Sequence, residues 1–314
     1  MKRSPFRALY PMAARSAPWW PVAVPLLLTG DAVTGRIQAL PGSVNTGSSL
    51  ASLALLLVGG AVSGLLAGLL GIGGALVSIP VLHWALPALG IDVSQVSATA
   101  VATALMAMVP MTLLATWRQK QHGALETDWL RRIAFPTALG AAGGALLAAA
   151  LNGPVLALLF AMQSLWYGTG LLGLHTSIAS SGGGVIRRLA HLPPWLAVPP
   201  MAAFCGCVGM GGGSLLTPFL LAKRVPFRHA VATAGALNLC IALGGSAAFF
   251  VLRTQSAGTV ACMPAALCLA AGAMASVMFG VSLSHRISPL ALQRLIGTVN
   301  VVSAATLVGQ VTLH

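Results

Sequence analysis

Two glycine clusters are the parts of this sequence whose residue types and spacing could do chemistry. Their glycines are Gly71, Gly73 and Gly74 in the first cluster and Gly209, Gly211, Gly212 and Gly213 in the second. Glycine has no side chain to cover its N–H group, and a helix that starts after such a cluster offers free N–H groups and the positive end of its dipole. The clusters therefore predict a backbone cradle for one oxyanion. The alternative is that each cluster forms a tight hairpin that contacts no ligand.

The clusters belong to a duplicated unit. Residues 68–82 are echoed by residues 206–220 without a gap, and Ala98-Thr99 is echoed by Ala232-Thr233. The unit reads as an apolar element interrupted by glycine and followed by three helices, twice over. If each interrupted element returns to its own side of a membrane, each copy makes three crossings and the second copy is inverted. Two inverted repeats, each with a glycine-interrupted helix hairpin, are typical of secondary transporters.

Polar side chains near the clusters are few. Thr99, Thr233 and Asn238 fall on the helices predicted after each interrupted element. Their hydroxyl and amide groups can donate hydrogen bonds to a sulfonate oxygen, although Ser and Thr in membrane helices often bond to their own backbone instead. The acidic residues all fall in the predicted tail or loops; they are Asp31, Asp92, Glu126 and Asp128. A cation path normally needs carboxylates within the membrane, so we expect an anionic ligand.

Cys205 and Cys207 support an alternative function. Soft sulfur ligands bind copper(I), and the pair precedes the second glycine cluster directly. A membrane thiol-redox or copper-handling protein is therefore the second hypothesis. Against it, the sequence has no Cys-x-x-Cys motif, and a buried cysteine commonly behaves as a small hydrophobic residue. Because the usual motifs of soluble enzymes are also absent, we expect no catalytic residues, no metal site and no cofactor.

The composition requires a membrane around these residues. The 314 residues are 57% hydrophobic and 7% charged, with a mean hydropathy of +0.89, whereas a soluble domain carries about 25% charged residues. These values exclude a soluble enzyme, a disordered chain and a disulfide-stapled module. The formal net charge of +13 comes from short basic clusters between apolar runs, as the positive-inside rule predicts for cytoplasmic loops. Without a basic stripe interleaved with aromatic residues, we expect the lipid bilayer as partner and no nucleic acid.

The apolar runs predict an all-α fold, a polytopic transmembrane helical bundle. The expected long helices cover residues 50–70, 95–117, 133–151, 155–175, 195–208, 230–252, 262–284 and 290–311, and the shorter pieces after the glycine clusters cover residues 76–89 and 214–221. The expected domains are a polar, proline-rich leader (1–49), a first transmembrane repeat (50–175), a cytoplasmic linker (176–194) and a second repeat (195–314). The leader's apolar run, residues 19–29, is too short to span a bilayer; it is a signal-like segment, a tail or a misassigned start.

From about Leu50 to Val311 the sequence resembles the TauE/SafE family of sulfite exporters, also called the sulfonate uptake permease family. The resemblance is carried by the two glycine motifs and by residues 122–129, 225–233 and 285–295. It implies a multi-pass protein of the bacterial inner membrane that exports sulfite or small organosulfonates, driven by an ion gradient with H⁺ as the coupling ion. The family usually has Gly-x-Gly-Gly-Gly in both halves. Here Ala75 replaces the last glycine of the first motif, and its methyl group could narrow one side of the site.

Overall fold

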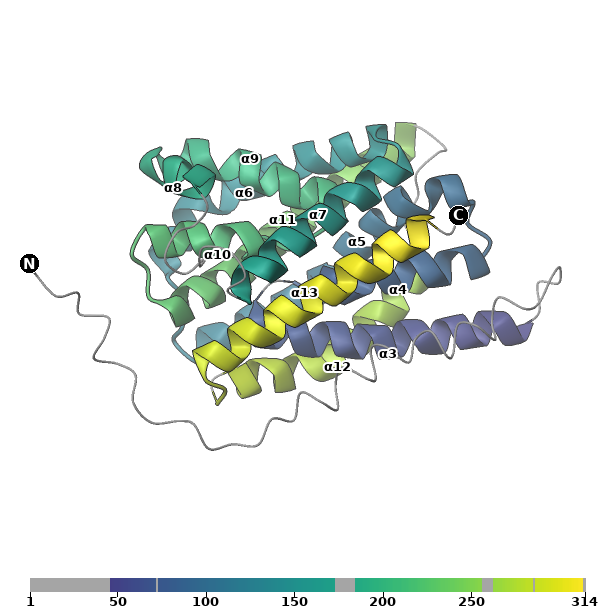
Figure 1. Ribbon diagram of the computed structural model, residues 1–314, viewed down its shortest axis with the longest axis horizontal. Helices are drawn as coiled ribbons and strands as arrows, with labels where there is room; N and C mark the ends of the chain where they lie inside the picture. The colour runs from purple at the N-terminus through teal and green to yellow at the C-terminus, as the bar shows by residue number, and fades with distance from the viewer. Residues whose placement is uncertain (1–45, 72, 173–183, 256–261, 285, 313–314) are drawn as a thin grey trace, which may run out of the picture. The chain divides into compact units, whose positions relative to one another are not determined.

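The computed structural model describes residues 46–71, 73–172, 184–255, 262–284 and 286–312 (Figure 1). Every regular element within these ranges is a helix, so the predicted all-α fold is confirmed for them. Residues 1–45 of the predicted leader lie outside the described residues, and residues 46–49 already belong to the first described helix. From the predicted linker, the part up to residue 183 also lies outside them.

The helices follow the predicted order. The first half contains α3 (Thr46–Leu70), α4 (Ala75–Ala88), α5 (Val93–Gln121), α6 (Thr127–Ala150) and α7 (Gly153–Leu171). After α8 (Gly184–His191), the second half contains α9 (Pro194–Val208), α10 (Gly213–Ala222), α11 (Phe227–Gln255), α12 (Met263–Ser284) and α13 (Pro289–Thr312). Among the described residues, six helices are long and apolar enough to cross a membrane: α3, α5, α6, α7, α11 and α12. The protein is therefore built as a multi-pass membrane protein.

The two predicted interruptions separate α3 from α4 and α9 from α10. The chain turns at Gly71 and Gly73, with φ of +62° and +82°, and at Gly209, with φ of +72°. A residue with a Cβ adopts these left-handed conformations only at a cost, which explains why glycine stands there. Gly209 ends α9 as its C-cap, a common role for a left-handed glycine.

Close helix contacts hold the bundle together. Helix α3 lies along α12, where a Cβ on Gly60 or Gly64 would collide with backbone of α12. Helix α9 lies along α6, where a Cβ on Gly144 or Gly206 would collide with backbone of the facing helix. Small residues let helices approach closely in a bilayer, which has no hydrophobic force to drive them together.

The apolar surface of the bundle fits a lipid environment. Large hydrophobic side chains lie on its outside, among them Phe135 at 75% exposure and Phe279 at 74%. A soluble monomer rarely leaves such residues exposed in contiguous areas. Lipid, unlike water, is a favourable neighbour for them.

The basic loops gather at one end of the helices. Lys223, after α10, donates a hydrogen bond to the carbonyl of Leu192, before α9, at 3.4 Å. Glu126, before α6, pairs with His229 at the start of α11 at 3.2 Å. These contacts place the loop before α6, the end of the linker and the loop before α11 next to one another.

Candidate functional site

The two glycine clusters meet inside the bundle. A Cβ added to Gly73 would lie 3.1 Å from the Cα of Gly211 and 2.7 Å from the methyl carbon of Met108. The backbones of the two clusters therefore pack against each other with no side chain between them. Residues distant in sequence form this contact, which joins the α3–α4 turn to the α9–α10 turn.

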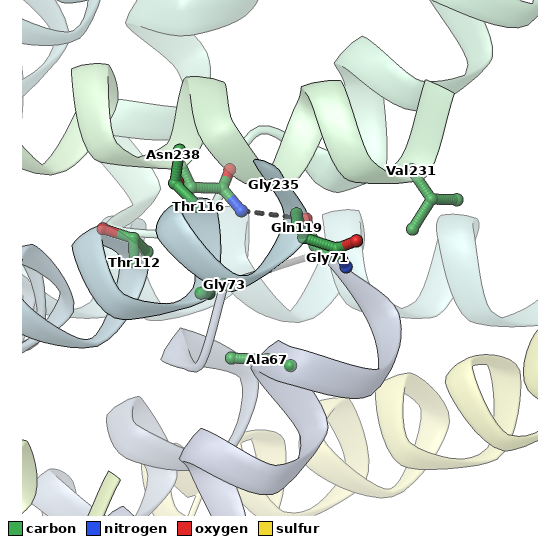
Figure 2. A pocket seen from close by; sticks show the side chains of 11 residues that line it. Ala67, Gly71, Gly73, Thr112, Thr116, Gln119, Val231, Gly235 and Asn238 are labelled. Atoms are coloured by element: carbon green, nitrogen blue, oxygen red, sulfur yellow. Dashed lines mark hydrogen bonds between the residues drawn. The ribbon is translucent and has the colours of Figure 1, made fainter. Parts of the chain in front are cut away.

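Asn238 on α11 connects the two turns through its amide. Its Nδ2 donates a hydrogen bond to the carbonyl of Gly71 at 2.8 Å, drawn in Figure 2, and its Oδ1 accepts one from the N–H of Gly212 at 2.6 Å. The side chain is 1% exposed, so water does not compete for these bonds. The structure thus brings Asn238, a predicted substrate-binding residue, to the glycine clusters, where both polar groups of its amide are already hydrogen-bonded.

The backbone N–H groups of the clusters differ in what they bind. Gly71 donates to the carbonyl of Ala67 at 2.9 Å, and Gly209 donates to the carbonyl of Gly206 at 3.3 Å. In contrast, the N–H groups of Gly73, Gly74, Gly211 and Gly213 have no hydrogen-bond acceptor among the described residues. Among the predicted glycines, these four groups are free to bind a ligand.

The helices α4 and α10 begin directly after the two glycine clusters. Gly74 precedes α4 as its N-cap, and Gly212 precedes α10 in the same role. Ala75 and Gly213, at the position where the two motifs differ, are the first residues of these helices, and both are buried. The positive ends of two helix dipoles therefore adjoin the contact between the clusters.

The two predicted threonines are buried on the helices that follow the clusters. Thr99 lies on α5 and is 2% exposed. Thr233 lies on α11, and its hydroxyl accepts a hydrogen bond from the N–H of Glu126 at 3.1 Å. That bond ties α11 to the loop before α6, so the hydroxyl of Thr233 serves a loop contact in this conformation.

Helices α7 and α13 support the short helices with side chains that were not predicted as site residues. Gln163 on α7 donates to the hydroxyl of Ser214 at 2.7 Å, and Ser303 on α13 donates to the carbonyl of Leu76 at 2.8 Å. Pro80 explains the second bond, because it has no N–H for the carbonyl four residues earlier. The proline signals in the sequence that the carbonyl of Leu76 needs a partner, but not which helix supplies it.

Ser63 on α3 fixes the first turn from the other side. Its hydroxyl donates to the carbonyl of Gly74 at 2.7 Å and lies 2.9 Å from the hydroxyl of Ser78. A Cβ on Gly74 would collide with this hydroxyl. Gly74 is therefore required by a close side-chain approach, whereas Gly71 and Gly73 are required by their backbone conformation.

A small cavity adjoins the clusters. Its volume is about 10 Å³, roughly the room needed for the centre of one water molecule. The wall consists of uncharged residues from α3, α5 and α11 and from the first glycine turn; they are Ala67, Gly68, Gly71, Gly73, Thr112, Ala115, Thr116, Gln119, Val231, Gly235 and Asn238. Figure 2 shows the labelled side chains around it.

The acidic residues in the described part of the chain lie at the starts of helices. Asp92 and Glu126 are N-cap residues of α5 and α6, and Asp128 lies in the first turn of α6. At these positions the carboxylates complement the positive ends of helix dipoles. Among the residues that the structure describes, no carboxylate lines the cavity beside the clusters.

Cys205 and Cys207 are buried near the end of α9. Both side chains belong to the hydrophobic core, with exposed fractions of 0% and 3%, so their sulfur atoms take part in packing. In the ranges that the structure describes, no group of three or more His, Cys, Asp or Glu side chains lies together in a way that could hold a metal ion.

The chain is similar in sequence to a family of membrane proteins and to one curated protein. Residues 55–307 match the family described as sulfite exporter TauE/SafE. A protein of Haemophilus influenzae described as "Probable membrane transporter protein" is 26% identical over 207 residues, which are 63% of this chain and 73% of that protein. No solved structure matches the chain.

Proposed function

Because the chain belongs to the sulfite exporter TauE/SafE family, we propose that it is a secondary transporter that exports sulfite or a small organosulfonate anion. The family resemblance predicted from the glycine motifs is confirmed, and with it the expectation of a membrane transporter rather than an enzyme. The substrate, the coupling and the site residues belong to the proposal.

One observation carries the proposal: two glycine turns meet deep in the bundle, and a single buried amide joins them. The N–H groups of Gly73, Gly74, Gly211 and Gly213 are free to bind among the described residues. Together with the starts of α4 and α10, they offer partial positive charge without a cationic side chain. An oxyanion held this way is bound by hydrogen bonds and can leave again, as transport requires.

The pairing of helices supports two inverted repeats. Helix α3 packs along α12, and its counterpart α9 packs along α6, the counterpart of α12. Gly68 and Gly206, which occupy equivalent positions in the two repeats, show the same pairing. A Cβ on Gly68 would collide with α12 at Val277, and a Cβ on Gly206 would collide with α6 at Ala141. A two-fold relation between the halves produces such exchanged contacts, and inverted halves are the usual basis of alternating access.

Anion binding requires the turns to move apart. The cavity of about 10 Å³ holds no more than a water-sized group, and sulfite has four non-hydrogen atoms. In the opened conformation, the backbone of both clusters would bind the anion, with Asn238, Thr99 and Thr233 as side-chain assistants. Thr233 would have to exchange its bond to Glu126 for one to the substrate, which couples substrate binding to the loop before α6.

The membrane orientation and the coupling complete the proposal. The basic loops lie together at one end of the helices, and the positive-inside rule assigns such an end to the cytoplasm. The membrane would be the bacterial inner membrane. Family membership is the support for coupling to H⁺, since the described acidic residues sit at helix starts.

Flux measurements in proteoliposomes test the proposal. We expect radiolabelled sulfite or a small sulfonate to cross the membrane faster than in protein-free liposomes, and an imposed pH gradient to drive its accumulation. Tetraethylammonium is a control for leakage of the vesicles. Folded protein that moves neither anion would refute the proposed substrate class, and anion flux that ignores the pH gradient would refute the coupling.

The cysteines distinguish this proposal from the thiol hypothesis. Replacing Cys205 and Cys207 together by alanine should leave sulfite flux in place, because their sulfur atoms are packed in the hydrophobic core. If the folded double variant loses sulfite flux, a function that uses the thiols is favoured. The same holds if the unmodified chain binds copper(I) and the double variant does not.

A further inference from the structure

The small cavity beside the glycine clusters contains two side chains that the proposed backbone cradle does not use. Thr116 and Gln119 lie on the last turns of α5 and line the cavity together with Gly71 and Asn238. In Figure 2 the end of the Gln119 side chain lies close to Gly71, beside the bond from Asn238. The two residues therefore adjoin the first glycine turn directly.

Both side chains bury an unpaired polar atom. Neither Oε1 of Gln119 nor Oγ1 of Thr116 has a hydrogen-bond partner among the described residues, and Gln119 is only 8% exposed. Unpaired buried polar atoms are costly and rare in folded proteins, so each one calls for an explanation. Thr112, one turn earlier on the same wall, avoids this cost because its hydroxyl donates to the carbonyl of Met108 at 2.7 Å.

The spacing of these residues defines a polar stripe. Thr112, Thr116 and Gln119 are four and three residues apart, and such residues lie on one face of a helix. The stripe begins beside the glycine turn and ends where Arg118 and Lys120 occupy the last turn of α5. It therefore leads from the basic end of the bundle to the glycine clusters.

The chemistry of the stripe favours an anion. The cavity wall has no charged residue, so no carboxylate in it repels an anion. The hydroxyl of Thr116 can donate a hydrogen bond, and a half-turn of the Gln119 amide presents its NH₂ group in place of Oε1. Neutral donors bind an oxyanion without neutralising it, which leaves it able to move on.

We propose that Gln119 and Thr116 are substrate-contacting residues that bind the oxyanion between the basic loops and the glycine clusters. This inference rests on the proposed function, since it assigns side-chain ligands to the same transport path. It also explains why the polar atoms of Gln119 and Thr116 stay unpaired while the hydroxyl of Thr112, in the same wall, is paired: the partner of the two unpaired atoms is the substrate.

A charge substitution with a matched control tests the inference. Gln119→Glu places a carboxylate in the path, and Gln121→Glu places the same carboxylate two residues along α5, where the side chain is exposed and accepts a bond from Arg118 at 2.9 Å. At equal protein content, we expect Q119E to lower sulfite flux by about tenfold or more through like-charge repulsion. Q121E should remain within about twofold of the unmodified chain.

A second variant keeps the test independent of folding defects. Thr116→Val removes the hydroxyl and preserves the shape, so we expect a KM for sulfite raised by about three- to tenfold with maximal flux retained. Thr298→Val is its control, because the hydroxyl of Thr298 donates to the carbonyl of Leu295 at 2.9 Å. If the unmodified chain transports sulfite while Q119E behaves as Q121E and T116V as T298V, the inference is overturned and the proposed function stands.

Thiol labelling decides the inference if the unmodified chain carries no sulfite, which would refute the proposed function. Gln119→Cys is treated with sulfonatoethyl methanethiosulfonate, a thiol reagent that is itself a small sulfonate, or with its trimethylammonium counterpart. Mass spectrometry then reads the modification at position 119, and Gln121→Cys reports the reactivity of an exposed position. Preferential modification of the Q119C variant at this position by the sulfonate reagent supports an anion path along the stripe. Equal modification by both reagents, or none, overturns it.

Discussion

Substitution of Asn238 by alanine is the sharpest test of how the two glycine turns are held. The variant would leave the carbonyl of Gly71 and the N–H of Gly212 without the partners they have at 2.8 and 2.6 Å. Each unpaired buried group costs about 1–3 kcal/mol. The adjoining cavity, enlarged by the lost amide, can admit a water that satisfies part of this loss. We therefore expect the free energy of unfolding to fall by about 2–4 kcal/mol.

Asn238→Asp separates the architectural role of the amide from its effect on an anion. The carboxylate keeps an acceptor for the N–H of Gly212 but turns its second oxygen toward the carbonyl of Gly71, where Nδ2 donates now. It also brings negative charge to the proposed binding groups. We expect N238D to abolish sulfite flux even in protein that remains folded, because repulsion adds to the lost hydrogen bond.

The assay combines unfolding in mixed micelles, titrated with a denaturing detergent, with sulfite flux in proteoliposomes. Asn152 is the matched control, since it is exposed and its side chain makes no cap hydrogen bond at the start of α7. N152A and N152D should change the free energy of unfolding by less than about 0.5 kcal/mol. If N238A unfolds as N152A does, the amide does not join the turns and the account of the site is wrong.

Two glycine pairs give further predictions. Gly73→Ala and Gly90→Ala place a Cβ at nearly the same positive φ, +82° and +85°, but only the Cβ at position 73 meets atoms within 4 Å. Both variants should lose about 1–2 kcal/mol of stability through backbone strain. Only G73A should also lose sulfite flux. Equal flux in the two variants would contradict the close contact of the turns. Gly144→Ala would collide with the carbonyl of Ala203, whereas Gly143→Ala meets nothing, so G144A should destabilise the protein by about 1–3 kcal/mol. G143A should stabilise it by up to about 1 kcal/mol, and similar thermal unfolding of both would argue against the α6–α9 packing.

The sequence predicted the helices well and their ends less well. The apolar run 95–117 corresponds to α5, which continues to Gln121, and the run 230–252 corresponds to α11, which spans Phe227–Gln255. Apolar residues mark the part of a helix that faces lipid, whereas backbone hydrogen bonding continues through polar residues until a turn ends it. For α5 that turn is at Gly123, with φ of +66°.

The glycine turns were predictable because they depend on local backbone chemistry. Glycine clusters reveal turns because few other residues adopt their conformations, and Asn238 was notable as an amide on an apolar helix. The partners of these groups were not predictable, because the bond from Ser303 to Leu76 joins residues 227 positions apart. Gln119 was missed because it lies next to Arg118 and Lys120, where a polar residue in the sequence looks like part of a basic loop.

The amide of Asn238 gives the two proposed repeats unequal roles. Counting from the matched threonines Thr99 and Thr233, the position of Asn238 corresponds to Ala104 on α5, which is buried and has no polar side chain. In an inverted duplication, the inward-open and outward-open conformations arise by exchanging the conformations of the two halves. Identical halves would make the two conformations equal in energy, but one amide that bonds both turns favours the conformation in which they are in contact. The proposed transport cycle would therefore break at least one of its two bonds. When the bond from Gly212 breaks, its freed N–H group can donate to the oxyanion instead.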